Sequence, residues 1–139
     1  MQMHDAWLKK AHSDLLIAKK LFDLNELDLF DGAAYHTQQC AEKAFKSYLA
    51  YKKQNIEKTH NLVLLVKLCS QYDAEFESLL NISAILNPYS IKFRYPDDVM
   101  VPEKSDLKEA IDSAEVIFKF IKKKISEFNT GQGSIFRKL

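Results

Sequence analysis

The chain has 139 residues, the size of one domain, and its 47% apolar and 28% charged residues are typical of a packed globular protein and exclude a disordered one. Twenty basic against nineteen acidic side chains leave a net charge of +1, so no overall field draws the molecule onto nucleic acid or anionic lipid. Three glycines and three prolines exclude a turn-rich all-β fold and a glycine-rich phosphate loop.

The sequence also predicts where the protein works and which cofactors it lacks. No apolar stretch has the length of a membrane span or a signal peptide, so we expect a cytoplasmic protein that does not enter membranes. Cys40 and Cys69 stand alone, without CxxC spacing, which favours buried reduced thiols. Because no histidine has a partner at a metal-binding spacing, we expect neither a metal nor a cofactor.

The first two predicted elements are amphipathic helices. Apolar residues recur every three or four positions over residues 5–23, with lysines between them. Residues 24–31 break this period, and Asp31 can cap a second helix that runs to about Lys53. Small residues let a neighbouring helix approach closely, so we expect the second helix to be central. Its stripe of small side chains consists of Ala33, Thr37, Cys40 and Ala44.

Two shorter helices are predicted next. Either Thr59 or Asn61 can cap a third helix, whose apolar face extends to about residue 72. A fourth helix is predicted to begin near Ala74 and to end close to Pro88, because proline kinks a helix or begins its last turn.

The last part of the domain is predicted to be a loop followed by a long helix. Residues 93–104 hold two prolines and no helical period, which indicates a loop. Ser105 can cap a helix that keeps the 3.6-residue period up to Phe128. We therefore predict an all-α fold, an up-and-down antiparallel bundle of four to five helices over residues 1–128. The polar segment 129–139 is predicted to be a flexible tail.

The second helix carries a polar edge with two possible interpretations. Its members lie at three- and four-residue spacing along about three turns. They could form a solvated edge with a Gln39/Lys43 or Glu42/Lys46 pair, or a ligand-binding face. The edge consists of His36, Gln39, Glu42, Lys43 and Lys46.

The predicted loop brings together a second set of reactive side chains. Arg94 and Tyr95 precede Pro96 and two aspartates, and the proline restricts Tyr95 to extended conformations. Arginine grips phosphate bidentately and tyrosine can stack on a base, although Arg94 could instead pair with a neighbouring aspartate. His60 precedes the third helix, where it could cap that helix or bond to the bundle.

Three segments together resemble a known family. They are AAYHTQQCAEKAFKSYL at 33–49, THNLVLLV at 59–66 and FRYPD at 93–97. Their order and the Gln-Gln-x-x-Glu-Lys-x-x-Lys core resemble the HEPN domain (higher eukaryotes and prokaryotes nucleotide-binding domain) of bacteria and archaea, over residues 5–128. The resemblance implies a helical bundle that forms a homodimer. It also implies that the chain partners a minimal nucleotidyltransferase in a toxin–antitoxin pair.

The resemblance also implies what the chain lacks. In the ribonuclease branch of the family, an arginine followed four to six residues later by a histidine cuts RNA without a metal. Here Arg94 is followed by no histidine, and the last histidine of the chain is His60. Since general acid–base cleavage needs a group that titrates near neutrality, this absence favours a binding protein over an enzyme.

We therefore expect a homodimer that binds a nucleotide or RNA phosphate and partners a nucleotidyltransferase, without catalysis of its own. One alternative is a metal-independent endoribonuclease that uses Arg94 with His36 or His60. Another is a purely structural interaction module, in which Arg94 has no role in binding. The predicted ligand-binding residues are Arg94, Tyr95, Lys43, Lys46, Gln39, Glu42 and His36.

Overall fold

The structure is a computed structural model that describes residues 2–56, 58–90 and 102–138, with side chains described up to residue 126. In these ranges the chain forms five α-helices and three short 3-10 turns, with no strand. The helices are α1 (Met3–Asp23), α2 (Phe30–Tyr51), α3 (Leu62–Ser70), α4 (Leu80–Leu86) and α5 (Lys104–Lys138). The 3-10 turns are Leu27–Leu29, Ala74–Leu79 and Asn87–Ser90.

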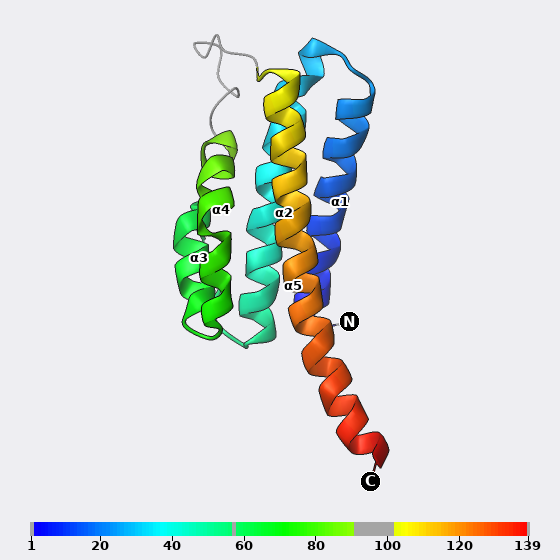
Figure 1. The fold of residues 1–139 in the computed structure, drawn as a ribbon, viewed down its shortest axis with the longest axis vertical. Coiled ribbons are helices and arrows are strands. Elements are labelled where there is room, and N and C mark those ends of the chain that lie inside the picture. Colours follow the sequence, from blue (N-terminus) through cyan, green and yellow to red (C-terminus); the bar gives the residue numbers. More distant parts are fainter. Residues whose placement is uncertain (1, 57, 91–101, 139) are drawn as a thin grey trace.

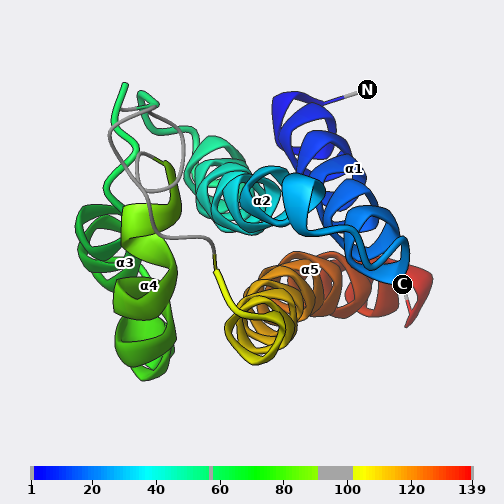
Figure 2. The same cartoon turned by 90° about the horizontal axis from the view of Figure 1, so that it is seen from above.

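Around α2, helices α1 and α4 run antiparallel to it, whereas α3 and α5 run in the same direction as α2 (Figure 1). Helices α1, α2 and α5 form a triangle when viewed along their axes, and α3 and α4 lie beside α2 on the side away from α1 (Figures 1 and 2). The predicted all-α bundle of four to five helices is confirmed, but it is not up-and-down throughout, because the chain runs back along α2 before α3 begins. Because α2 packs against α1, α3 and α5 together, 15 of its 22 residues are buried and none is exposed.

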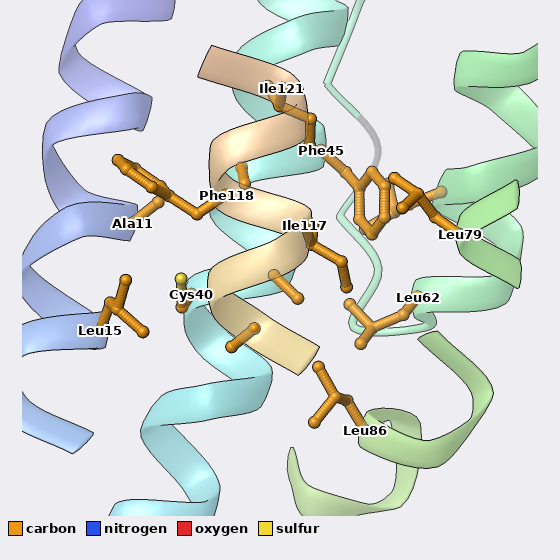
Figure 3. Close-up of a cluster of buried hydrophobic side chains, with 14 of the residues drawn as sticks. Ala11, Leu15, Cys40, Phe45, Leu62, Leu79, Leu86, Ile117, Phe118 and Ile121 are labelled. Atoms are coloured by element: carbon orange, nitrogen blue, oxygen red, sulfur yellow. The ribbon is translucent and has the colours of Figure 1, made fainter. Parts of the chain in front are cut away.

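The core follows from the alternation of small and large side chains along α2. Ala33, Ala41 and Ala44 are fully buried and let the neighbouring helices approach closely. Phe45 is also fully buried and packs against Phe76, with 6.3 Å between the ring centres. Figure 3 shows Phe45 among aliphatic side chains of α3, α4, α5 and the turn before α4, so one continuous core joins all the layers.

Of the residues predicted to cap the starts of helices α2, α3 and α5, only the one for α3 does so in the structure. Asn61, one of the two predicted caps, accepts bonds from the backbone N–H groups of Val63 and Leu64 at 3.1 and 3.3 Å. Asp31 does not cap α2, which begins one residue earlier, after a 3-10 turn. Ser105 does not cap α5 either, since that helix begins at Lys104.

The predicted fourth helix is divided in two. Its first part is the 3-10 turn Ala74–Leu79, whose beginning is capped by the side chain of Asp73, and only Leu80–Leu86 is α-helical. The predicted loop 93–104 lies mostly outside the described residues.

The last helix continues past the predicted end of the domain. The backbone of α5 is helical up to Lys138, and its last turns extend beyond the body of the bundle (Figure 1). Residues 129–138 are therefore helical where the sequence predicts a flexible tail, and the domain boundary at residue 128 stays a prediction.

Both cysteines lie in the core as free thiols, as predicted. Burial raises the pKa of the Cys40 and Cys69 thiols well above the usual range, so they stay protonated and unreactive. None of the helices in the described ranges has both the length and the apolar content needed to cross a membrane.

Removing the Phe45 ring should test the central role of α2. We expect Phe45→Ala to lower the free energy of unfolding by about 3–5 kcal/mol, because it leaves a cavity where α2, α3 and the turn before α4 meet. The measurement is urea denaturation followed by circular dichroism. Leu27→Ala is the control, because the Leu27 side chain is 69% exposed and its loss should change stability by less than about 0.5 kcal/mol. Equal losses in the two variants would contradict this account of the core.

Candidate functional site

The candidate site is a set of polar and charged side chains on one side of α2, between α1 and the segment 52–61. This segment returns along α2, because Gln54 N–H bonds to Leu49 O and the Gln38 side chain donates to His60 O at 2.9 Å. We call the set the polar cluster. It consists of Asp14 from α1, His60 from the returning segment, and His36, Gln38, Gln39, Glu42, Lys43 and Lys46 from α2.

Glu42 is the centre of one half of the polar cluster. Its side chain is 5% exposed, and its Oε2 accepts a bond from Lys46 Nζ at 3.0 Å. Its Oε1 lies 2.7 Å from His60 Nδ1. Because an ionised carboxylate only accepts, the imidazole donates from Nδ1 and leaves Nε2 available. The His60 side chain is 72% exposed, so a buried carboxylate orients an imidazole that reaches solvent.

Asp14 is the centre of the other half. Its Oδ1 lies 2.8 Å from His36 Nδ1 and its Oδ2 accepts a bond from Lys43 Nζ at 2.7 Å. Burial by itself would raise the pKa of this carboxyl, but the bonds from His36 and Lys43 outweigh burial and hold the pKa below its usual value. Asp14 is therefore ionised at neutral pH and holds both groups in place.

The charges of the polar cluster balance. The ammonium groups of Lys43 and Lys46 are each paired with a carboxylate. Such a set can hold a phosphate through the remaining ammonium N–H groups, and it can move a proton through either imidazole. It does not form a strongly positive patch.

The interpretation of this face as a solvated edge is wrong. Gln39, Glu42 and Lys46 are buried, because α1 and the returning segment cover them. The Glu42/Lys46 pair is present as predicted, whereas the Gln39/Lys43 pair is not. Instead, Gln39 donates to the side chain of Gln38 at 2.8 Å, and Lys43 reaches across to Asp14. Because they are buried, Gln39 and Lys46 bond to other protein groups and not to water as the sequence suggested.

Two predicted site residues, Arg94 and Tyr95, lie outside the described residues. Their distances to His36 and His60 therefore stay untested, and so does their place in the site.

Asp14 and Gln38 belong to the cluster but are absent from the predicted site. Both carried a signal in the sequence. Asp14 lies on the apolar stripe of α1 that Ala11, Leu15 and Ala18 form. Gln38 lies within the apolar face of α2. A polar side chain at such a position needs a buried partner, which is a reason to expect a network.

In the described part of the chain, no group of three or more His, Cys, Asp or Glu side chains is arranged to hold a metal ion. The chemistry that the cluster itself offers is therefore hydrogen bonding, ion pairing and proton transfer.

The fold and the site together define an all-α protein, a five-helix bundle with a buried polar cluster on its central helix. Residues 4–125 match the HEPN domain family, so the chain belongs to the HEPN family. It is similar to the putative toxin MJ1304 of Methanocaldococcus jannaschii, with 25% identity over 135 residues that cover 87% of each chain.

Two solved structures share the fold. The crystal structure of TT1696 from Thermus thermophilus superposes with a TM-score of 0.77 at 27% identity, covering 89% of this chain and 99% of that one. The structure of ST0689, an archaeal HEPN homologue, superposes with a TM-score of 0.68 at 26% identity, covering 90% and 99%. The similarity thus extends over nearly the whole bundle.

The Asp14 pairs should make stability depend on pH in a predictable direction. Because the folded pKa is lower than that of a free aspartate, 3.8, the ionised carboxylate stabilises the fold above about pH 4, and this contribution disappears as the pH falls through the folded pKa. We expect Asp14→Asn to cost about 1–3 kcal/mol at pH 7 and progressively less below pH 4. Urea denaturation at pH 7, 5 and 3 measures this difference.

The control is Asp112→Asn, because Asp112 forms an exposed pair with Lys108 and its loss should matter little at any pH. A cost of Asp14→Asn that is the same at pH 7 and pH 3 would contradict the assignment of an ionised, ion-paired Asp14.

Proposed function

We propose that this HEPN protein is the toxin-type member of a toxin–antitoxin pair. It acts as a homodimer that binds a nucleotide or RNA phosphate at the polar cluster, and its partner is a minimal nucleotidyltransferase. The observation that carries the binding proposal is the convergence of two lysines and one imidazole from α2, and a second imidazole from the returning segment, on two buried carboxylates.

Phosphate binding follows from the way the lysines are held. Asp14 and Glu42 each occupy one N–H direction of an ammonium group, and each ammonium has three N–H groups. Lys43, whose side chain is 25% exposed, can then donate its remaining N–H groups to phosphate oxygens, whereas the Lys46 side chain is 8% exposed and faces the Trp7 ring. Because each lysine stays paired with a carboxylate, we expect moderate affinity that depends on salt.

The biological part of the proposal is supported by the family and by one relative. The chain belongs to the HEPN family, and the M. jannaschii relative carries the name of a toxin. A toxin needs an antitoxin, and the HEPN resemblance implies a minimal nucleotidyltransferase in that role. Expression of the chain alone should slow growth, and co-expression of its proposed partner, a minimal nucleotidyltransferase, should restore it. Unchanged growth in both cases would refute the toxin assignment.

The homodimer is supported by apolar side chains left on the surface of the described bundle. Leu16 and Ile17 of α1 and Val116 of α5 are between 40% and 53% exposed. Leu16 comes three residues before Lys19 and Val116 directly follows Glu115, and the ion pair between Lys19 and Glu115 joins these two helices. An apolar surface of this kind is typical of a protein–protein contact. Light scattering at micromolar concentration should give twice the mass of the chain.

A second candidate function is a metal-independent endoribonuclease, and one observation favours it. The exposed His60 imidazole is held at Nδ1 by the buried Glu42 carboxylate, with Nε2 available, which is the arrangement of an oriented general base. Arg94 would supply the phosphate contact that the enzyme needs. In this mechanism, His60 takes the role of the histidine that follows the arginine in the ribonuclease branch of the family.

Removing the charge of Lys43 should weaken RNA binding. We expect Lys43→Met to lower the affinity for a short single-stranded RNA of any sequence and to reduce the salt slope of binding by about one, because one phosphate contact is lost. Fluorescence anisotropy over a range of salt concentrations measures both quantities. The control is Lys108→Met, which removes an exposed lysine of α5 outside the polar cluster. Equal affinity in the two variants would refute phosphate binding at the cluster.

A cleavage assay in EDTA separates the two candidate functions. If the ribonuclease candidate is right, wild-type protein cuts RNA, and His60→Gln lowers the rate by about 10²–10⁴-fold because the general base is lost. Arg94→Ala should lower it as well. The control is His12→Gln, since His12 stacks on Phe118 of α5 and is not a member of the cluster. Binding without cleavage leaves the binding protein as the function.

A further inference from the structure

The single tryptophan of the chain lies beside the polar cluster and away from the core. Trp7 is partly buried on α1, and among the described side chains it is not one of those that pack against the hydrophobic core. Lys46 Nζ lies over its ring, 5.7 Å from the ring centre. The same ammonium group binds Glu42, so the Trp7 ring is in direct contact with the cluster.

Trp7 shares its face of α1 with two charged residues. Trp7, Lys10 and Asp14 follow one another at spacings of three and four residues, which places them along one side of the helix. Trp7 meets Lys46 at one end of this row and Asp14 meets Lys43 at the other, so the exposed Lys10 lies between two contacts with α2. At the boundary between α1 and α2, the ring therefore contacts Lys46, and Lys10 and Lys43 lie further along the same side of α1.

An aromatic side chain beside a row of cations is the usual arrangement for binding single-stranded nucleic acid. The cations hold the backbone phosphate, and the ring stacks on the base, which every nucleotide offers as a flat π surface. A ring that served only the stability of the bundle would pack into the core, where a tryptophan buries most surface.

We propose that Trp7 is a nucleobase-stacking residue, and that it holds the base of a nucleotide or single-stranded RNA whose phosphate is bound by Lys43. This rests on the proposed function, because it assigns a second subsite to the same ligand. Trp7 supplies affinity for any base, and specificity for one base would need polar groups elsewhere.

The experiment uses the full-length protein, in which all tryptophan fluorescence comes from Trp7. The probes are AMP and ribose 5-phosphate, together with a single-stranded hexaadenylate and an abasic oligomer of the same length. AMP and hexaadenylate should quench the fluorescence with a saturating dependence on concentration, and the two probes without bases should not. The AMP and hexaadenylate arms also distinguish a free nucleotide from RNA as the ligand.

Three variants test the contribution of the ring to affinity. We expect Trp7→Leu to weaken hexaadenylate binding about tenfold, with no change for the abasic oligomer. Trp7→Phe should recover most of the loss because it keeps an aromatic face. The control is Tyr72→Leu, which removes an exposed aromatic ring just after α3 and should leave binding unchanged. Circular dichroism confirms that each variant is folded.

The possible outcomes separate the two proposals. Quenching by base-containing probes, with a loss of affinity in Trp7→Leu, supports the stacking site. Binding of hexaadenylate measured by anisotropy, without quenching and with equal affinity in Trp7→Leu, overturns the stacking site and leaves phosphate binding intact. Absence of binding for every probe overturns phosphate binding at the polar cluster, and the stacking site with it.

Discussion

Asp14 and Glu42 are ion-paired carboxylates withdrawn from water, and each must be surrounded by donors, because an unpaired buried charge costs several kcal/mol. Lys43, Lys46 and His36 supply donors from α2 itself, and the Gln38 amide adds a longer bond to Glu42 at 3.5 Å. His60 is brought by the returning segment. These contacts hold α1 and the returning segment in place along α2. Because the returning segment leads into α3, its path also sets where α3 begins.

Close packing is what makes this arrangement possible. Ala33, Cys40 and Ala44 have no bulk to hold α1 and α5 away from α2, so side chains that sequence periodicity places at an edge become covered. A larger residue in this stripe would separate the helices and admit water to the ion pairs, which would then contribute little. The apolar core and the polar cluster therefore depend on the same close helix contacts.

The neutral charge balance of the cluster constrains its function. Sites that bind phosphate by charge alone present unpaired cations, whereas here every described lysine of the cluster has a carboxylate partner. Under the proposed function, affinity for a nucleotide would then come from several modest contacts, including hydrogen bonds and aromatic stacking. The same pairing fixes the imidazole of His60 in one orientation, which matters for proton transfer more than for affinity.

The periodicity of residues 5–23, 31–53 and 105–128 was enough to predict the bundle, because an amphipathic helix must bury its apolar face whatever lies opposite. The Glu42/Lys46 pair was also predictable, since both residues lie on one helix four positions apart. Only the tertiary structure brought Asp14 to Lys43, His60 to Glu42 and Trp7 to Lys46. These contacts join residues far apart in the chain, and helix periodicity gives the face of a side chain but not the element that will cover it.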